Sequence, residues 1–397
     1  MGGTKSGVKN TGWRAWRLIA AMGAVVTLAA IGAVGCGGGS NTSIFPFAGL
    51  WVANSGGPNV AHFTGSELNL NTSNTAPKTV LNNALFISPQ DVTFDNTGNM
   101  WIVDGGLNDG RGTGAAVYEF ALAQLKNLNS QPSPSPTFII VSTTAAPFFM
   151  FPQFAVFDAG HNLWVSDSGS SQILKFSASQ LATPTRVSIT PAATLQGAAP
   201  GVFNGPLGMA FDKNGNLWIA NNNTTGNTII EISAAVLAAA SGPVNPIVPA
   251  TILKNPAVGP LNIDNPWGML FDSNGNLWFT NEQLDVSKCA GSVVEFSGTL
   301  IAAGGVLSPT PTVTLTQTAI SGTESLCDPN GISMTSAVAP ATVGNISVAN
   351  VGNNSVSEYA AEQITGSGSP TPNLFIIGAA TTLRAPTGLS YGPLSLE

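Results

Sequence analysis

Charged residues are scarce in this chain of 397 residues: 13 are basic, 20 are acidic, and together they make up 8% of the sequence. About a quarter of the residues are charged in an average soluble domain. Hydrophobic residues nevertheless reach 43%, which is enough for a buried core and argues against disorder. Because the net charge is −7 and no cluster of Lys or Arg occurs, a phosphate backbone would be repelled. We therefore exclude nucleic acid as a partner.

Histidine and cysteine are almost absent, with two and three residues respectively. Histidine is the side chain best suited to accept a proton near neutral pH. His161 falls in a predicted hairpin turn and His62 in a predicted strand, and we interpret both as structural. The chain also lacks a Cys-x-x-Cys zinc motif, a nucleophile elbow and a phosphate-binding glycine loop. We therefore assign no catalytic residue.

The amino-terminal segment has the order of a secretory signal. Four basic residues and no acidic ones lead into an apolar or small-residue run from Leu18 to Gly35, which ends at Cys36. Ala33-Val34-Gly35-Cys36 resembles the bacterial lipobox, in which the cysteine is diacylated. We expect residues 1–35 to be a lipoprotein signal peptide, Cys36 to be lipidated, and 36–44 to be a flexible tether. The alternative is an uncleaved membrane anchor.

Removal of this leader would leave 9 basic and 20 acidic residues, a net charge of −11. On this interpretation the protein is a monomer of the bacterial cell envelope, exported and held on the periplasmic or outer-membrane face by its lipid anchor. Cys289 and Cys327 would then be the remaining cysteines, in an oxidising compartment that favours pairing. We predict a disulfide between them; two separate thiols, or half of a metal site, are the alternatives.

The body, residues 45–397, contains an internal repeat. Its clearest copies run from Pro206 to Asn221 and from Pro266 to Asn281, and both contain Phe-Asp-x-Asn-Gly-Asn-Leu-Trp. The opening proline recurs at spacings of 63, 54, 60, 63 and 57 residues, as Pro89, Pro152, Pro206, Pro266, Pro329 and Pro386. Six copies of one structural unit are therefore present.

Each copy is typical of antiparallel sheet. A short apolar strand leads through an Asp-x-Asn-Gly turn into a second strand, as at 217–220. A third strand of alternating character follows, as at Thr228–Ile232, Ser292–Phe296 and Ala116–Phe120. Ser-Pro-rich segments at 135–141 and 308–315 predict a fourth strand at the blade edge, where proline is tolerated.

Four strands in each of six copies predict an all-β fold, a six-bladed β-propeller. The last copy, from Pro386, holds only an innermost strand, whereas residues 49–67 begin in mid-repeat. Joined together, the two termini would complete one blade and remove the open sheet edge. A solenoid would instead show capping repeats at both ends.

The Pro-x-Gly, Phe-Asp-x-x-Gly-Asn-Leu-Trp and Glu-Phe elements resemble those of NHL-repeat propellers. The sequence is also similar to the related SMP-30/gluconolactonase-like and streptogramin B lyase-like propellers, over about residues 45–397. This resemblance implies a six-bladed propeller whose channel mouth holds the ligand site. One such scaffold hosts unrelated activities, so the resemblance does not fix a function.

In the lactonase-like propellers, metal ligands stand just after the opening proline and two residues before it. The first position here holds Gln90, Gln153, Leu207, Trp267, Asn330 and Thr387, and the second holds Ile87, Met150, Asn204, Asp264, Cys327 and Arg384. Only Asn330 and Asp264 match, so a Ca²⁺ ion, the cofactor that the resemblance would imply, would have one carboxylate among its ligands.

Two further positions repeat with the blades. Asn54, Asp104, Asp167, Asn221, Asn281 and Asn350 end the second strands, where we expect short side chains to cap turns rather than bind ligand. The tryptophans Trp51, Trp101, Trp164, Trp218 and Trp278 share one position, with Ser347 in the fifth copy. We expect these tryptophans to pack between blades rather than to stack on sugars.

Function should reside where the copies differ. The long loops at 105–114 and 282–291 place Asp109, Arg111 and Glu282 beside the strand starts Asp91, Gln153, Asp264, Trp267 and Asn330, as candidate ligand-binding residues of the channel mouth. We hypothesise a non-catalytic envelope lipoprotein that binds a protein, peptide or glycan there. The alternative is a metal-dependent lactonase, hydrolase or lyase, and the loops could also be solvated insertions.

Overall fold

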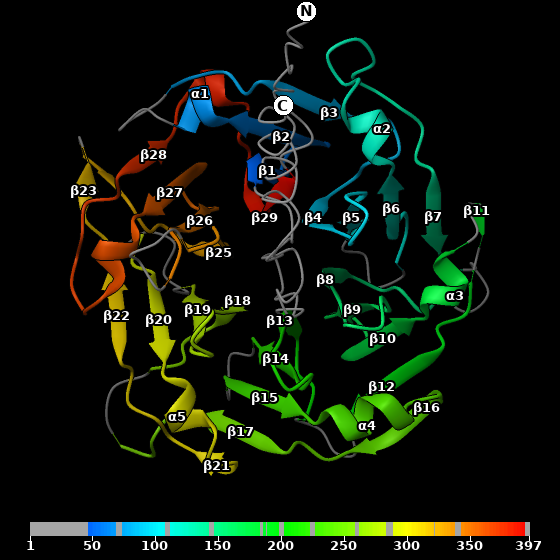
Figure 1. The fold of residues 1–397 in the computed structure, drawn as a ribbon, viewed down its shortest axis with the longest axis vertical. Helices are drawn as coiled ribbons and strands as arrows, with labels where there is room; N and C mark the ends of the chain where they lie inside the picture. Colours follow the sequence, from blue (N-terminus) through cyan, green and yellow to red (C-terminus); the bar gives the residue numbers. More distant parts are fainter. Residues whose placement is uncertain are drawn as a thin grey trace, which may run out of the picture. The chain divides into compact units, whose positions relative to one another are not determined.

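The computed structural model describes most of the body of the chain. The described residues are 47–68, 74–107, 112–142, 147–182, 186–187, 189–197, 202–222, 227–258, 262–282, 289–320, 322–337 and 343–393. Within them, six sheets are arranged in a ring around a central axis (Figure 1). The signal peptide, Cys36 and the tether lie outside the described residues.

Each sheet contains four antiparallel strands, ordered from the centre of the ring to its rim. Blade 1 comprises β4 (Pro89–Phe94), β5 (Met100–Asp104), β6 (Ala116–Phe120) and β7 (Phe138–Val141). Blade 2 comprises β8 (Pro152–Phe157), β9 (Leu163–Asp167), β10 (Gln172–Phe176) and β12 (Ala193–Gly197). Blade 3 comprises β13 (Pro206–Phe211), β14 (Leu217–Asn221), β15 (Thr228–Ile232) and β17 (Thr251–Lys254).

The second half of the ring repeats this order. Blade 4 comprises β18 (Pro266–Phe271), β19 (Leu277–Asn281), β20 (Ser292–Phe296) and β22 (Val313–Thr316). Blade 5 comprises β25 (Pro329–Met334), β26 (Ile346–Asn350), β27 (Ser355–Tyr359) and β28 (Leu374–Ile376). Blade 6 comprises β29 (Pro386–Pro393), β1 (Phe47–Asn54), β2 (Asn59–Thr64) and β3 (Thr79–Asn82). The predicted all-β, six-bladed propeller is confirmed.

Blade 6 is shared between the two ends of the chain, as predicted. β29 pairs antiparallel with β1 from Phe47↔Pro393 to Asn54↔Pro386. All eight residues of β29 are buried. In Figure 1 the red strand β29 and the blue strand β1 lie side by side at the centre of the ring. The pairing satisfies the backbone groups of both inner strands and closes the ring.

Each Asp-x-x-Gly-Asn turn is held by its own aspartate. Asp212 accepts hydrogen bonds from the backbone N–H of Asn214 and Asn216 through Oδ1. Its Oδ2 accepts from the Trp218 indole N–H at 3.3 Å. The same indole bond forms in blades 1, 2 and 4, at 3.1, 2.8 and 3.1 Å. The motif therefore fixes both the hairpin and the orientation of the tryptophan ring.

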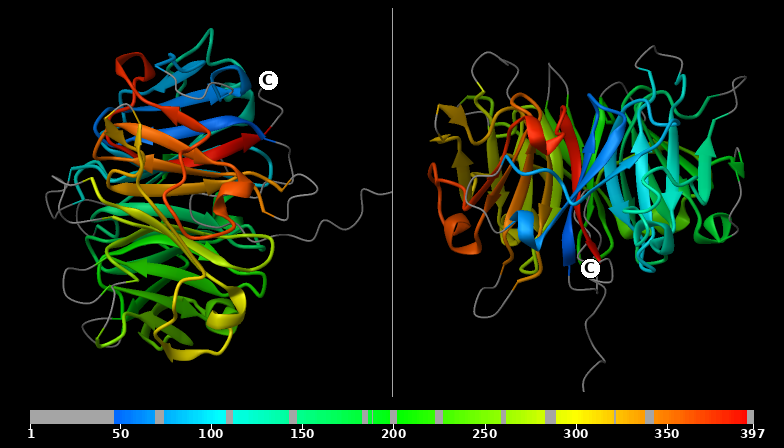
Figure 2. Two further views of the ribbon diagram at one scale, coloured as in Figure 1. Left: turned by 90° about the vertical axis from the view of Figure 1, so that its left-hand side faces the viewer. Right: turned by 90° about the horizontal axis from the view of Figure 1, so that it is seen from above.

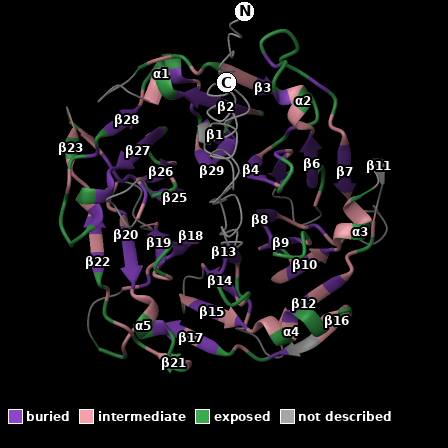
Figure 3. Cartoon of the chain, viewed as in Figure 1, coloured by how far each residue is buried: buried purple, intermediate pink, exposed green. Residues whose placement is uncertain are grey.

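The oriented tryptophans pack between blades, as expected. Trp218 of blade 3 lies edge-on to Phe271 of blade 4, with ring centroids 5.9 Å apart. Equivalent contacts join Trp51 to Phe94, Trp101 to Phe157 and Trp164 to Phe211. Blade 5 has no aromatic ring here, and Ser347 hydrogen-bonds instead to the Tyr391 hydroxyl of blade 6 at 2.7 Å. The core therefore consists of layers between blades, which Figure 3 shows as buried strands around the axis.

The fourth strands differ from the prediction in two ways. The predicted fourth strands are present, but β7 begins at Phe138 and β22 at Val313, after the prolines of the predicted segments. In three blades the fourth strand is also not the edge. Short segments of the following blade, β11 (Arg186–Val187), β16 (Gly242–Ile247) and β21 (Gly305–Leu307), pair parallel with β7, β12 and β17. Prolines do occur in the true edge strand β16, which suits their missing N–H.

The predicted disulfide between Cys289 and Cys327 is present, with a Cα–Cα distance of 4.0 Å. It joins the loop after β19 to the connection that enters blade 5, two consecutive blades that meet at one face of the ring. Among the described residues, no helix is both long and apolar enough to serve as a membrane span.

Candidate functional site: the channel mouth

The channel mouth is the end of the ring at which the innermost strands begin. There the Asx residue closing each second strand accepts a hydrogen bond from the backbone that leads into the innermost strand. Asp104 accepts from the N–H groups of Ile87 and Ser88 at 2.8 and 3.0 Å. The other five bonds go from Met150 to Asp167, Asn204 to Asn221, Asp264 to Asn281, Cys327 to Asn350 and Arg384 to Asn54. The expected turn-capping role is confirmed.

The predicted mouth residues do not all lie together. Asp109 and Arg111 lie outside the described residues. Gln153 lies at the start of β8 and is 2% exposed. Asp264, Trp267, Glu282 and Asn330 cluster around blades 4 and 5, as described below. The described candidates therefore form two groups: Asp91 and Gln153 in blades 1 and 2, and the four residues around blades 4 and 5.

Asp91 requires a correction, because its side chain is not open at the mouth. It is 0% exposed, and its carboxylate accepts the Ala155 backbone N–H of blade 2 at 3.1 Å. The corresponding residue in four other blades is glycine. At Gly268, for example, an added Cβ would lie 2.6 Å from the Asn330 carbonyl oxygen of the next blade. Asp91 therefore occupies the contact layer between innermost strands, where its pKa is raised to about 8 by burial.

Three consecutive blades contribute a group of polar side chains to the mouth, which we call the polar sector. Its members are Asn222 of blade 3, Asp264, Asn265, Trp267 and Glu282 of blade 4, and Asp328 and Asn330 of blade 5. Backbone bonds hold them in place: Glu282 N–H donates to the Asn265 carbonyl at 3.1 Å, and the Asn330 carbonyl accepts the Thr280 hydroxyl at 2.6 Å.

Several polar atoms of this sector are buried without a hydrogen-bond partner in the described structure. They are both side-chain amide atoms of Asn265, Nδ2 of Asn222, the indole nitrogen of Trp267, Oδ1 of Asp328 and Oδ1 of Asn330. Asn265, Asp328 and Asn330 are 0%, 3% and 2% exposed. Leaving such a group unpaired costs about 1–3 kcal/mol, and clusters of them mark sites whose polar partner is something other than the fold itself.

The two carboxylates Glu282 and Asp328 interact electrostatically. The pKa of Glu282 is raised to about 7, first by burial and then by the negative charge of Asp328, while the Asn222 amide nearby lowers it. That amide lies close to the carboxylate without hydrogen-bonding geometry. Burial also raises the pKa values of Asp328 and Asp264. The sector therefore holds a carboxylate whose charge changes near neutral pH.

The backbone of this sector is strained at the residues before the opening prolines. Asn265 and Asp328 have φ angles of 48° and 49°, in the left-handed region, where blade 3 has Gly205 at 60°. Asn and Asp are the non-glycine residues that adopt this region most readily. Strain of this kind persists only where the surrounding structure enforces it, and it gathers at functional sites.

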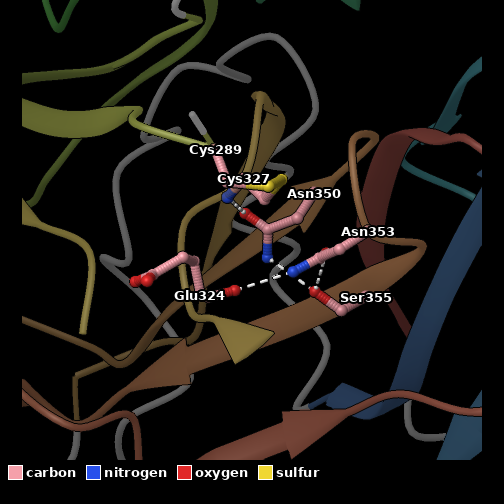
Figure 4. The surroundings of a disulfide bond; sticks show 6 residues. All are labelled: Cys289, Glu324, Cys327, Asn350, Asn353 and Ser355. Carbon is pink, nitrogen blue, oxygen red and sulfur yellow. Dashed lines mark hydrogen bonds between the residues drawn. A yellow bond between two sulfur atoms is a disulfide. The ribbon is translucent and has the colours of Figure 1, made fainter. Parts of the chain in front are cut away.

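The disulfide anchors the sector from the side of blade 5. Cys327 directly precedes Asp328, and Cys289 ends the loop that begins at Glu282. Figure 4 shows the bridge beside Asn350, whose Oδ1 accepts the Cys327 N–H at 3.3 Å and whose Nδ2 donates to Ser355 at 3.2 Å. Two covalently linked loops therefore carry the two interacting carboxylates.

Sequence reasoning missed Asn222, Asn265 and Asp328. Asn222 and Glu282 each follow the capping Asx residue of their blade. Asn265 and Asp328 each precede the opening proline. Apart from Glu282, the residues selected from the sequence stand at other repeat positions. A signal was available at the pre-proline position, which holds Ser88, Phe151, Gly205, Asn265, Asp328 and Ala385. Two adjacent copies carry an amide and a carboxylate there.

The described residues do not fit the calcium site that the lactonase resemblance implied. Among them, no three Asp, Glu, His or Cys side chains converge closely enough to hold a metal ion. Ca²⁺ prefers six to eight oxygen ligands with several carboxylates. The polar sector instead mixes acceptor oxygens with the N–H donors of Trp267, Asn222 and Asn265, which repel a cation.

The fold and this mouth define a six-bladed β-propeller with a polar cluster at one end of its axis. No family model matches the sequence, and no curated protein matches it significantly. Solved structures do share the fold. The structure of a nidogen/laminin complex contains a chain that is 13% identical, with a TM-score of 0.51 over 87% of this chain and 98% of that one.

Two enzymes are also structural neighbours. A periplasmic gluconolactonase from Pseudomonas aeruginosa is 13% identical, with a TM-score of 0.45 over 87% of this chain and 99% of that one. A streptogramin B lyase is 14% identical, with a TM-score of 0.40 over 72% of this chain and 70% of that one. At identities this low, none of these likenesses assigns a function to this chain, which must be argued from the site.

Proposed function

We propose that this protein is a non-catalytic binding propeller of the bacterial envelope, tethered through Cys36, which holds a peptide, protein or glycan at its channel mouth. The observation that carries the proposal is the polar sector, where three consecutive blades gather buried polar atoms that have no partner among the described residues. A ligand that supplies donors and acceptors would satisfy them.

The charge of the body supports a neutral or basic ligand. The body carries 20 acidic residues, and the sector contributes three of them, Asp264, Glu282 and Asp328. An acidic ligand would meet repulsion both at long range and in the site. Trp267, which is partly exposed at the start of β18, adds an apolar surface and one indole N–H donor.

The test is a binding screen of the soluble body, residues 45–397, on arrays of glycans and of neutral or basic peptides. We expect selective binding that Glu282→Gln and Asn330→Leu each weaken about tenfold or more, because each removes a buried polar partner. Glu362→Gln, an exposed residue of the short helix η1 (Ala361–Ile364), is the control and should bind as the wild type does. Selective binding that is unaffected by both sector variants would contradict the proposal.

A second candidate function is acid–base catalysis on a lactone or a similar ester, and one observation favours it. Glu282 lies beside Asp328 with a pKa of about 7, which suits a general acid or base at neutral pH. Incubation of the body with lactones, with and without a chelator, separates this function from simple binding. Turnover that is lost in Glu282→Gln, or metal-dependent turnover that is lost in Asp264→Ala, would establish an enzyme.

A further inference from the structure

A cavity of about 470 Å³ lies between blades 3 and 4, at the hairpin end of the innermost strands. We call it the hairpin cleft; Trp218, Glu231 and Thr251 line it from blade 3, and Phe271, Asn274 and Gly275 from blade 4. The mouth is at the Pro206 end of β13, whereas the cleft adjoins Asp212 at the other end. No residue of the polar sector lines the cleft. The two therefore lie on opposite faces of the ring, which Figure 2 shows edge-on.

Two repeat positions affect the space at this junction. Gly275 stands in the blade 4 turn where blade 2 has His161, whose Nε2 lies 3.3 Å from Asn96 of the blade 1 turn. A Cβ added to Gly275 would meet nothing within 4 Å. Between blades 2 and 3 the space is filled by Lys175, whose Nζ lies 5.0 Å from the Trp164 ring centroid.

Among the glutamates at this repeat position, Glu231 is the one that lines the hairpin cleft. Glu119 of blade 1 accepts a hydrogen bond from the Asn99 amide at 2.8 Å, and Glu358 of blade 5 accepts from two asparagine amides. Glu231 accepts the Thr251 hydroxyl through Oε2. Within the described residues no donor reaches its Oε1, and Glu231 is partly exposed. One carboxylate oxygen is therefore available to a ligand.

The remaining lining sets the chemistry of that ligand. Trp218, Phe271 and Ile301 form an apolar floor, and the exposed Asn214 and Asn274 form an amide rim that both donates and accepts. Asp212 and Lys213 also line the cleft, so their opposite charges offset each other and Glu231 leaves one net negative charge, which disfavours an anionic ligand. Cavities of about 300–1,000 Å³ hold small molecules.

We propose that the hairpin cleft is a second ligand site, which takes a neutral saccharide of one or two rings. Sugar hydroxyls donate to a carboxylate and exchange hydrogen bonds with amides, while the C–H face of the ring contacts an apolar floor. This site is independent of the function proposed for the channel mouth, since the two share no residue.

The probes are maltose, cellobiose and lactose at millimolar concentration, tested against the soluble body by saturation-transfer NMR and calorimetric titration. We expect at least one disaccharide to bind with a Kd of about 1 mM or tighter. Glu231→Gln should weaken it about tenfold, because the charged acceptor is lost while the shape is kept. Gly275→His, which copies the blade 2 residue, should abolish binding by filling the cleft.

The matched control is Glu295→Gln, which changes the same repeat position in blade 4 and does not line the cleft. It should bind as the wild type does. Thermal unfolding of each variant verifies that it folds; if Gly275→His does not, Glu231→Gln decides alone. Absence of binding for all three disaccharides, or binding that Glu231→Gln leaves unchanged, would overturn the proposal.

Discussion

Asp91 differs from the glycine that four other blades have at the same repeat position, and we expect this difference to have a measurable effect on folding stability. Asp91 carries a carboxylate into a layer where four other blades have glycine, and its Oδ1 has no partner within the described structure. Burial raises its pKa from 3.8 to about 8. An unfolded aspartate ionises near pH 4, so between about pH 4 and 8 unfolding releases a proton. The folded state should therefore lose stability as the pH rises through this window.

Asp91→Asn keeps the shape and the acceptor for the Ala155 N–H but cannot ionise. We expect the variant to be more stable than the wild type at neutral pH, and the difference to grow by about 1.4 kcal/mol per pH unit across the window before levelling off above about pH 8. Denaturant unfolding of both proteins at several pH values measures this difference. A constant difference between about pH 5 and 8 would show that Asp91 does not stay protonated in the fold.

The polar sector illustrates the limit of residue-level prediction. Asp264, Trp267, Glu282 and Asn330 could be selected from the sequence because they interrupt a regular pattern at the mouth. Asn265 and Asp328 differ from the other copies in residue type at the pre-proline position, but their left-handed φ angles and their lack of partners among the described residues become evident only in three dimensions. Asp91 was expected at the open mouth, whereas the structure buries it in the close contact between innermost strands, where four other blades have glycine.

At the scale of elements, strand order and blade closure could be predicted because hydrophobic periodicity and turn chemistry are local signals. The parallel strands β11, β16 and β21 could not, because each is short and pairs with the fourth strand of the preceding blade. These pairings connect consecutive blades at the rim, across three neighbouring junctions. The disulfide could be predicted because the repeat frame placed both cysteines on the same face of adjacent blades.

Deletion of residues Pro386–Glu397 tests the closure. It removes β29, which is buried along its whole length, and exposes the backbone groups of β1. We expect the unfolding temperature of the truncated body to fall by about 10 °C or more, or the protein to aggregate. The control is a shorter deletion of residues 394–397, which leaves β29 intact and should have little effect. Equal unfolding temperatures for the intact and the long-truncated body would refute the shared blade.

At the scale of the whole molecule, the proposed tether would determine where the propeller acts. Replacing Cys36 by Ser removes the proposed acylation site, and we expect the variant to be released from membranes or to retain its signal peptide. Fractionation and the mass of the isolated protein measure both outcomes. A Ser variant that stays with the membrane at the mature size would show that lipidation is not the anchor. An uncleaved anchor would instead leave the mass of all 397 residues.

The central claim is that the polar sector binds a ligand, and the indole N–H signals of the soluble body test it most directly. The Trp101, Trp164, Trp218 and Trp278 indoles donate to aspartates, whereas the Trp267 indole nitrogen is buried and has no partner among the residues that the structure describes. Titration with a ligand selected on the arrays should shift the Trp267 signal, assigned through Trp267→Phe, and leave those four in place. A ligand that binds without moving the Trp267 signal would contradict the account.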